Sequence, residues 1–597
     1  MPSAAAPLWP YCGHGAAPVI DPVGCRGICI PGHSKCLAHL SSTDRATYLA
    51  SLSAGADVDH RGTPFTERLL AQLLNAMRDQ TTGGIAVGRA RFDGAKFSGE
   101  ADFADVTFTG RAEFFGSVFD DYGRFKRARF EGRTLFLGAV FPEASFEQAV
   151  FEDSVHFTNA SFQGEARFSR VECLSTSSFA RARFNGDAKF DRSTFAKVSF
   201  TGATFATVAD FSDTAFGKTP SLGPLVCTGT IDLEGAVFEA PVTLEIAAAA
   251  VDCQRTRWDA TAELRLRHAD LHLHDAVLTA PTAVTTHATP FSYLGLPLPE
   301  AAINSREASV HVTSVQGVDA SHLVLTDTDL ADCRFTGAFH LDQIHIEGRT
   351  TFAPVPKGLH LRGRIWPVRC SQRRTLAEEH HWRAQVTDHP AIFPQHPPTE
   401  RSWRTGPHHG DPAHTPDPED IAAVYRQLRK AFEDAKNEPG AADFYYGEME
   451  MRRHSRDDTS RSERALLHGY WLLSGYGLRA SRALGWLAAA MLATVLLLMG
   501  FGLPQRSPAQ EATGTVPAGG GRVTFTLDKD DPQNPTGNRF TGKRFDQALT
   551  VTLNSVIFRS SGTDLTTTGT YTEMASRLLE PALLALAVLA VRGRIKR

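Results

Sequence analysis

Large apolar side chains recur every five or six residues between Phe92 and Phe216, and the positions between them are mostly polar. Of the 24 recurring positions, 23 are Phe and one is Cys173, and the residue two places earlier is almost always small or β-branched. This spacing fits neither the period of an α-helix nor that of a β-strand. It predicts a chain that turns a corner once per repeat and points one Phe inward on each side. Four sides would close a coil of about 20–22 residues, stacked on the next coil at roughly 4.8 Å.

Such coils can be stable only as a stack. Burying each Phe side chain contributes roughly 1.5–3 kcal/mol. Ordering the backbone costs about 1–2 kcal/mol per residue, so hydrogen bonds between coils must form as well. The segments Ala90-Arg91-Phe92 and Ala95-Lys96-Phe97 carry a small residue followed by a central Phe, which resembles the motif of the pentapeptide-repeat family. The resemblance implies a mainly β fold over 84–216, a right-handed quadrilateral β-helix.

The repeat weakens after Phe216 and then returns. Apolar residues again step by five or six within 233–244 and 325–352. We therefore expect 217–355 to continue the solenoid as degenerate coils, with a looped interruption near 279–308, where four Pro residues fall.

Residues 1–40 contain four of the nine Cys residues of the chain but almost no apolar periodicity. A segment this short needs something other than a hydrophobic core to order it, and a metal ion is a usual solution. Spacings such as Cys36-x2-His39 allow two side chains of one tight turn to reach the same tetrahedral ion. We predict a structural Zn²⁺ with the following ligands: Cys12, Cys25, Cys36 and His39, with Cys29 and His33 as alternates. The competing interpretation is an unordered arm with incidental thiols.

Residues 41–83 predict a helical cap for the open end of the solenoid. Helices are expected at about 43–53 and 64–78. In the second helix, Thr63 is the predicted N-cap and Pro64 the first helical residue. One face of this helix should cover the first coil, since an unpaired solenoid end needs a cap. That face carries Leu69, Leu70, Leu73, Leu74 and Met77.

A Pro- and His-rich segment, 356–416, follows the solenoid. Its proline density and low apolar content predict a flexible spacer, and we expect its histidines to be solvated rather than bound to metal. Juxtamembrane helices are predicted over 417–456, with Asp417 as N-cap and Pro418 at the first helical position. The stretch with Tyr425-Arg426 and Phe444-Tyr445 resembles a helical element of bacterial proteins that join pentapeptide repeats to membrane segments.

Residues 463–597 form the predicted membrane region. The segment 483–503 has 21 residues without a charge, about 31 Å as a helix, which is enough to cross a bilayer. A second span is predicted at about 572–591, although it contains Glu580 and Pro581. Arginines flank the two spans, and the N-terminus lacks the features of a signal peptide. These features predict a plasma-membrane protein with two spans and with both its N-terminal bulk and its C-terminus in the cytoplasm. The alternative is a buried helix of a soluble protein.

Between the two spans, 545–558 has helical apolar spacing and almost no charge. The predicted order of elements is a span, an outer loop, a short helix and a second span. This order resembles that of two-helix ion channels, which are sometimes fused to pentapeptide repeats. The resemblance implies a pore with 545–558 as a re-entrant pore helix. The potassium-filter signature Thr-Val-Gly-Tyr-Gly is absent, and Arg559-Ser560-Ser561-Gly562 occupies its place, so potassium selectivity has no residues to depend on. The alternative is a two-helix anchor with an interfacial hairpin.

The composition and the motifs of the chain exclude several classes of function. The chain has 62 Lys and Arg against 66 Asp and Glu, and 91–216 has 15 against 18. It therefore has neither the basic excess of a nucleic-acid binder nor the acidic stripe of a DNA mimic. With no nucleophile elbow or metalloprotease motif in the sequence, we expect no enzymatic activity and no nucleic-acid partner. The leading hypothesis is a membrane-anchored, non-enzymatic solenoid that presents a rigid cytoplasmic surface to an unknown protein partner. The second is a homo-oligomeric pore regulated by the solenoid.

Overall fold

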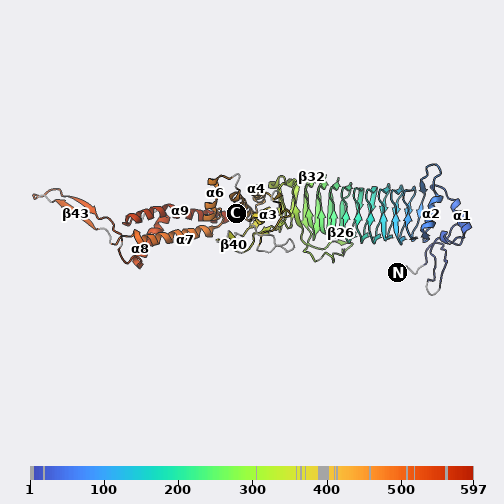
Figure 1. Ribbon diagram of the computed structural model, residues 1–597, viewed down its shortest axis with the longest axis horizontal. Helices are drawn as coiled ribbons and strands as arrows, with labels where there is room; N and C mark the ends of the chain where they lie inside the picture. The colour runs from blue at the N-terminus through green and yellow to red at the C-terminus, as the bar shows by residue number, and fades with distance from the viewer. Residues whose placement is uncertain are drawn as a thin grey trace. The chain divides into compact units, whose positions relative to one another are not determined.

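The computed structural model describes residues 6–17, 21–303, 305–357, 359–362, 366–369, 372–386, 402–408, 410–411, 414–455, 459–505, 509–515, 518–534, 536–557 and 562–595. The chain forms two compact units, each with its own architecture. The first consists of residues 1–416 with 427–436, and the second of residues 417–426 with 437–597. Figure 1 labels their main helices and strands.

The first unit is built around a β-solenoid of about 12 turns (Figure 1). Each full turn contributes four short strands, one to a side, and each strand pairs in parallel with its counterparts in the neighbouring turns. One turn and its partners in the next are β5 (Lys96–Ser98) with β9 (Val118–Phe119), β6 (Ala101–Asp102) with β10 (Tyr122–Arg124), β7 (Val106–Phe108) with β11 (Arg129–Phe130), and β8 (Ala112–Glu113) with β12 (Thr134–Leu135). The backbone hydrogen bonds therefore run along the solenoid axis, and the coil predicted from the Phe spacing is confirmed.

The following turns repeat this arrangement. Their strands are β13 (Val140–Phe141), β14 (Glu143–Ser145), β15 (Val150–Phe151), β16 (Val155–His156), β17 (Ser161–Phe162), β18 (Ala166–Arg167), β19 (Glu172–Ser178), β20 (Arg183–Phe184), β21 (Ala188–Lys189), β22 (Thr194–Ser199), β23 (Thr204–Phe205), β24 (Ala209–Asp210) and β25 (Ala215–Phe216). β19 is longer than its neighbours and pairs with both β15 and β16, so two sides of the solenoid join into one sheet there.

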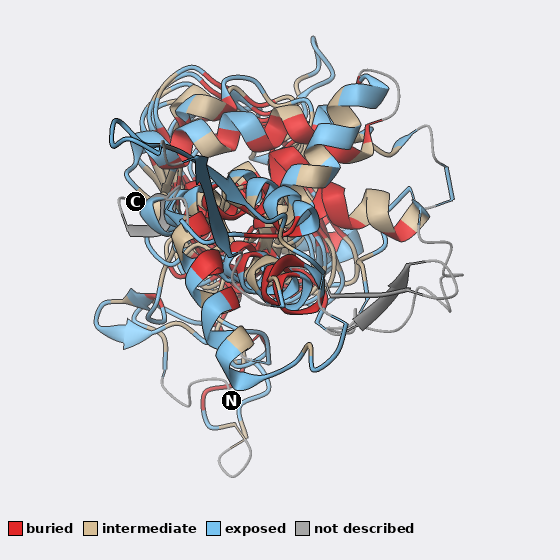
Figure 2. Ribbon diagram, turned by 90° about the vertical axis from the view of Figure 1, so that its left-hand side faces the viewer, coloured by how far each residue is buried: buried red, intermediate tan, exposed pale blue. Residues whose placement is uncertain are grey.

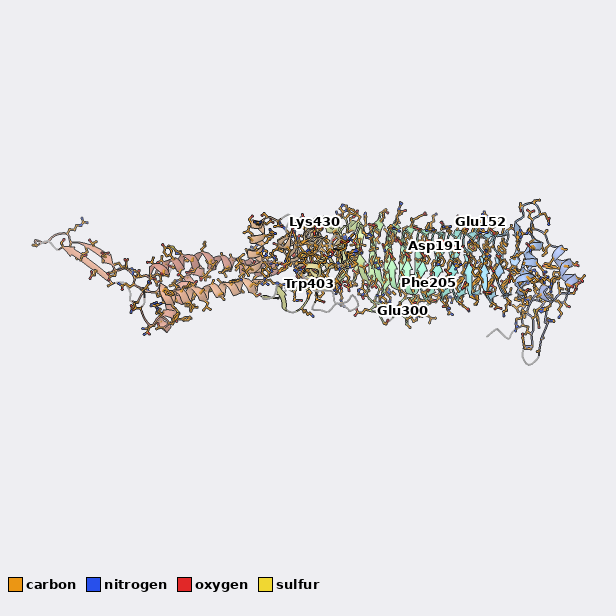
Figure 3. All side chains as sticks on the ribbon, viewed as in Figure 1. Glu152, Asp191, Phe205, Glu300, Trp403 and Lys430 are labelled. Carbon is orange, nitrogen blue, oxygen red and sulfur yellow. The ribbon has the colours of Figure 1, made fainter. Side chains whose placement is uncertain are left out.

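Phe rings fill the interior of the coils. Rings one turn apart stack in parallel, as in Phe108 and Phe130, whose centroids lie 4.7 Å apart at an interplanar angle of 1°. Rings on opposite sides of the coil meet edge to face, as in Phe125 and Phe136 at 5.3 Å and 80°. Both arrangements suit the quadrupole of an aromatic ring. Figure 3 labels Phe205, which is buried within the coils, and Glu152 and Asp191, which are half-buried.

Small residues two places before each Phe leave room for these rings. Gly123 shows the constraint, since a Cβ atom there would lie 2.9 Å from Cδ1 of the Phe141 ring. Most five-residue steps also turn through a residue with positive φ two places after the Phe, such as Asp105 (φ 59°) and Arg127 (φ 57°). Non-glycine residues adopt this left-handed conformation at a cost, so the stack on both sides must hold these corners in place.

The solenoid continues through 217–286 with shorter turns. β26 (Ser221–Asp232) and β28 (Val242–Asp252) are long paired strands, and β27 (Val237–Phe238), β29 (Arg257–Trp258) and β32 (Val277–Leu278) follow one another at 20-residue spacing. Trp258 takes the place of a Phe and stacks on Phe238 at 6.0 Å. β30 (Ala262–Arg267), β31 (Asp270–His272) and β33 (Thr282–Thr286) complete these turns. The coils of this region are thus shorter but regular.

A loop, 287–309, leaves the stack after β33 and returns at β36 (His311–Ser314), which pairs with β31. The predicted interruption near 279–308 therefore begins later than expected, because Thr282–Thr286 still pairs with β30. The loop contains the hairpin β34 (Ser292–Tyr293) and β35 (Leu296–Pro297) and lies against the outside of the coils. Its Glu300 is buried and pairs with Arg267 at 3.0 Å, which fixes the loop to the solenoid wall.

The N-terminal end of the solenoid is covered by α1 (Ser42–Ala50) and α2 (Glu67–Ala76). Leu69, Leu70, Leu73 and Leu74 of α2 are buried, as the apolar stripe predicts. The predicted N-cap is wrong: the hydroxyl of Thr66, not Thr63, accepts from the Leu69 N–H. Pro64 belongs instead to β2 (Pro64–Thr66), which pairs with β5 and stacks Phe65 on Phe97 at 5.3 Å. The first turn of the solenoid thus precedes the repeat visible in the sequence, and it begins with β1 (Val58–Asp59), paired with β4 (Ala90–Arg91).

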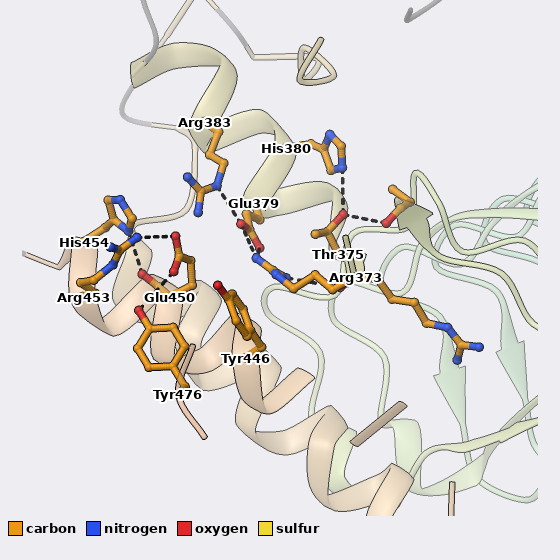
Figure 4. Close-up of polar contacts among 12 residues, drawn as sticks. Arg373, Thr375, Glu379, His380, Arg383, Tyr446, Glu450, Arg453, His454 and Tyr476 are labelled. Carbon is orange, nitrogen blue, oxygen red and sulfur yellow. Dashed lines mark hydrogen bonds and ion pairs between the residues drawn. The ribbon is translucent and has the colours of Figure 1, made fainter. Parts of the chain in front are cut away.

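The other end is closed by residues that the sequence assigned to a flexible spacer. Beyond β37 (Leu323–Thr326) and β38 (His345–Glu347), β39 (Ala353–Pro354) pairs with β42 (Arg374–Thr375), and β40 (Leu359–Arg362) pairs with β41 (Trp366–Arg369). α3 (Ala377–Val386) follows, and its buried Glu378 accepts hydrogen bonds from the Phe335 and Thr336 N–H groups. Glu379 lies between Arg373 and Arg383 at 2.6 and 2.7 Å (Figure 4). Residues 387–401 of the predicted spacer lie outside the described residues.

The second unit is helical. α4 (Pro418–Asp434), at which the two units divide, begins at the predicted residue. α5 (Glu438–His454), α6 (Arg461–Ser474), α7 (Ala480–Leu497), a π-helix (Leu498–Gly502), α8 (Gly542–Val556) and α9 (Thr567–Ile595) follow, and β43 (Gln510–Thr515) and β44 (Thr524–Lys529) form a hairpin before α8. Tyr476 donates to Glu450 at 3.1 Å, and Glu450 pairs with Arg453 (Figure 4). Many helices of the molecule carry buried residues on one side and exposed ones on the other (Figure 2).

Two helical segments of this unit, Ala480–Gly502 and Thr567–Arg592, are long and apolar enough to cross a membrane. They overlap the spans expected at 483–503 and 572–591, and each is longer toward its N-terminus than the sequence pattern indicated. Only 33% of each apolar window is buried, and the rest is exposed or half-buried.

The ring stack makes a direct prediction about stability. Replacing Phe146, whose ring stacks on Phe125 and Phe168, by Ala should lower the free energy of unfolding by about 3–5 kcal/mol, because it leaves a cavity between two rings. Phe115 is the matched control, since its side chain is 59% exposed, and Phe115→Ala should change stability by about 0.5 kcal/mol or less. Denaturant midpoints followed by circular dichroism measure both values, and equal effects would contradict the inward stack.

Candidate metal centre

Four side chains of the N-terminal segment converge on one point. The ligand atoms of Cys12, Cys25, Cys36 and His39 all lie within 4.8 Å of one another. The Sγ atoms of Cys25 and Cys36 are 3.7 Å apart. Nδ1 of His39 lies 3.3 Å from Sγ of Cys36 and 3.6 Å from Sγ of Cys12. This Cys3His cluster could hold a metal ion.

The distances match tetrahedral coordination rather than a disulfide. A metal bound to sulfur at about 2.3 Å and to nitrogen at about 2.0–2.1 Å separates two sulfur ligands by about 3.8 Å, and a sulfur from a nitrogen by about 3.6 Å. A disulfide would bring two Sγ atoms to about 2.05 Å. All four cysteines of this segment are free thiols. The side chains are therefore arranged as the ligands of one ion would be.

Backbone hydrogen bonds bring the four residues together. The Cys12 N–H donates to the Gly27 carbonyl at 2.8 Å, and the Gly13 N–H donates to the Cys25 carbonyl at 2.9 Å, so two short segments run side by side. Cys36 precedes a 3-10 turn, Leu37–His39, which returns His39 toward it. Arg45 of α1 donates to the Leu37 and Ala38 carbonyls and so holds this turn against the helix.

Gly27 is essential to this packing. A Cβ atom at Gly27 would lie 2.8 Å from Cβ and 2.9 Å from Sγ of Cys36, so no larger residue fits. Its N–H also approaches Sγ of Cys25 at 3.5 Å and can donate to a thiolate there. Sequence reasoning missed this role. The only sign of it in the sequence is the presence of a glycine between Cys25 and Cys29.

The electrostatics favour a thiolate in the cluster. The thiol of Cys36 donates a hydrogen bond to Cys25, which lowers the pKa of Cys25 to about 5, while the same interaction raises the pKa of Cys36. A thiolate is the form that binds a metal ion. The ring of His14 contacts that of His39, with centroids 4.2 Å apart and the ring planes tilted by 34°.

The two alternate ligands lie apart from this group. Cys29 and His33 are not among the converging residues, and burial raises the pKa of the Cys29 thiol. His33 is exposed. The structure thus brings together the first four residues chosen from the sequence and leaves out the two alternates.

Metal content tests the cluster. Purified protein should retain one divalent metal ion per chain, and Cys36→Ser should lose it, because three ligands bind far more weakly than four. Cys29→Ser is the matched control and should keep the ion. Inductively coupled plasma mass spectrometry after dialysis gives the stoichiometry. Equal metal content in both variants would show that the cluster is not the binding site.

Comparison with known proteins finds a similarity in the solenoid. The family model for pentapeptide repeats (nine copies) matches residues 92–140 and 125–172. No curated protein sequence and no solved structure matches the chain significantly. The matched segments lie within the ring stack, so this part of the chain is a pentapeptide-repeat solenoid, while the Cys3His cluster and the helical unit lie outside the match.

Proposed function

We propose that this protein is a membrane-anchored, non-enzymatic scaffold whose solenoid presents a rigid cytoplasmic surface to a protein partner. The observation that carries the proposal is the outer surface of the coils. Backbone pairing fixes outward side chains of successive turns in rows at roughly 4.8 Å, so the surface is ordered before any partner arrives. A preordered surface loses little conformational entropy on binding.

The charges on this surface are of mixed sign. Opposite charges pair between neighbouring turns, as in Arg127 with Asp105 at 2.6 Å and Lys126 with Glu147 at 2.8 Å. Lys189 and Glu165 pair in the same way at 2.7 Å. A surface neutralised in this manner favours a protein partner over a nucleic acid, which needs an excess of positive charge.

The Cys3His cluster fits a structural role in this scaffold. Three thiols and one imidazole in tetrahedral arrangement are a typical ligand set for Zn²⁺. Four protein ligands close the coordination shell, so the ion would order the N-terminal segment without taking part in chemistry. We propose that Zn²⁺ stabilises the segment that precedes the first turn of the solenoid.

The outer faces of α7 and α9 support membrane anchoring. Large apolar side chains there are exposed, including Leu492 at 60%, Leu578 at 78% and Val588 at 55%. Water would leave this much apolar surface unfavourably solvated, whereas lipid covers it. Arg479 precedes α7, Arg482 lies in its first turn, and Arg592 ends the apolar segment of α9. These positive charges support two crossings of the plasma membrane with both ends of the chain in the cytoplasm.

Removing the apolar helices while keeping the solenoid tests the proposal. A photo-crosslinking residue at Leu174, which is 57% exposed on the solenoid, should give an adduct of discrete mass in membranes from the native host. Deleting 480–597 should release the protein into the soluble fraction and leave the same adduct. The control is the same Leu174 variant without irradiation, for which no adduct is expected. An adduct that requires the deleted helices, or a full-length protein that is soluble without detergent, would contradict the scaffold.

A second candidate function, a pore, is favoured by the position of α8. Ala548 and Val551 of α8 pack against Val495, Leu498 and Met499 at the end of α7. Arg544 donates to the carbonyl groups of Met499 and Leu503 at 3.0 and 2.8 Å, so the short helix is held against the end of a span. Two helices of one chain cannot enclose a channel, so this function needs a homo-oligomer. The segment 558–561, where a filter would begin, lies outside the described residues.

Planar bilayers distinguish the pore from a simple anchor. If the protein conducts ions, purified full-length chain should give discrete current steps, and deletion of 545–597 should abolish them. A variant shortened only in the hairpin, lacking 510–529, serves as the control and should still conduct. Silent bilayers with a protein that is oligomeric and correctly inserted would contradict the pore and leave the anchor.

A further inference from the structure

A carboxyl group is enclosed between the two apolar helices of the second unit. Glu580 of α9 has no solvent-exposed surface, and it lies near the middle of the apolar segment Thr567–Arg592. Its Oε1 is 2.8 Å from Oγ1 of Thr494, which lies in the middle part of the facing segment Ala480–Gly502. Its Oε2 is buried and has no hydrogen-bond partner among the described residues.

Counting hydrogens at this contact shows which form of Glu580 fits. Oγ1 of Thr494 lies 2.8 Å from Glu580 Oε1 and 3.0 Å from the Ala490 carbonyl oxygen, but a hydroxyl has one hydrogen to donate. With an ionised carboxylate, the hydroxyl can donate to only one of these two oxygens, so the other contact is not a hydrogen bond. With a proton on Oε1, Glu580 donates to Thr494 and Thr494 donates to Ala490, so both contacts become hydrogen bonds. The geometry therefore fits the neutral acid.

The surroundings agree with this protonation state. No charged group forms an ion pair with Glu580 among the described residues, and a lone carboxylate in an apolar layer is costly. Charged and titratable side chains on the helices that pack around this position lie toward the helix ends or on other turns. They are Arg482 of α7, Tyr571, Glu573, Arg577 and Arg592 of α9, Lys543, Arg544 and Asp546 of α8, and Arg461, Glu463, Arg464, His468 and Tyr470 of α6. Arg577, one turn before Glu580, is the nearest of these along α9.

We propose that Glu580 is a proton-binding site within the membrane, and that its O–H ties α9 to Thr494 of α7. Release of this proton would place a charge in the apolar layer and leave Thr494 with two acceptors for one hydrogen. The packing of α7 against α9 is therefore coupled to protonation. This inference rests on the membrane placement of α7 and α9 proposed above.

An apolar carbodiimide tests the site directly. The full-length protein in detergent micelles is treated with dicyclohexylcarbodiimide at about pH 8, at which a solvated glutamate is ionised and does not react. The carboxyl proton of a neutral acid moves to one carbodiimide nitrogen while the carboxyl oxygen bonds to the central carbon. Acyl transfer from oxygen to nitrogen then gives a stable N-acylurea, with no other reactant consumed. Mass spectrometry of peptides should find this adduct on Glu580.

Controls separate the proposal from general reactivity. Glu580→Gln should lose the adduct, and Glu573→Gln, which removes another carboxyl of α9, should keep it. A water-soluble carbodiimide should label exposed carboxyls and leave Glu580 unmodified. No adduct on Glu580 in the wild-type chain, or labelling of Glu580 that is lost above about pH 6 as for a solvated glutamate, would overturn the proposal. Flotation of the protein with lipid vesicles tests membrane placement independently, so the two failures can be told apart.

Discussion

Parallel stacking of aromatic rings from one turn to the next is the interaction on which the solenoid depends. A ring in the middle of the stack has a neighbour in the turn before and another in the turn after, so no turn is complete without the adjoining ones. The stack also tolerates turns of different length. Phe119 and Phe141 are 22 residues apart and their centroids are 4.5 Å apart, whereas Phe141 and Phe162 are 21 residues apart at 5.2 Å. The backbone corners absorb the extra residue, and the ring column sets the register.

A stack of this kind has two open ends, and the chain closes each by a different means. At the first, the apolar face of α2 covers the initial turn, and the Cys3His cluster lies in the segment before it. At the second, Glu378 of α3 accepts from two backbone N–H groups of a late turn. Unpaired strand edges invite association with other chains, so both closures protect the solenoid from growing by addition of a further strand.

How much of this could be predicted from the sequence depended on whether a signal was periodic. The Phe spacing predicted the coil because every side of every turn places one ring inside, which gives a regular signal in the sequence. Phe65 was not predicted to belong to the ring column because no Phe at the repeat spacing lies between it and Phe92. Pro64 beside it also resembled the first residue of a helix. α3 was missed because its short sequence lies among the prolines of 356–416. The residues of the Cys3His cluster were chosen by ligand type and spacing, but Gly27 and Arg45, which position them, act through backbone contacts that a sequence does not display.

The loop 287–309 has a consequence for the way such a protein can be altered. The chain leaves the stack after β33 and rejoins it at β36, while the turns on either side keep their pairing. Sequence added at this corner is therefore free of the constraint that governs the rest of the coil. Engineers could use the corner as an attachment point, inserting a foreign epitope or sensor into the excursion while keeping Glu300 and its pair with Arg267, so that the insert is carried at a defined place on a stiff support.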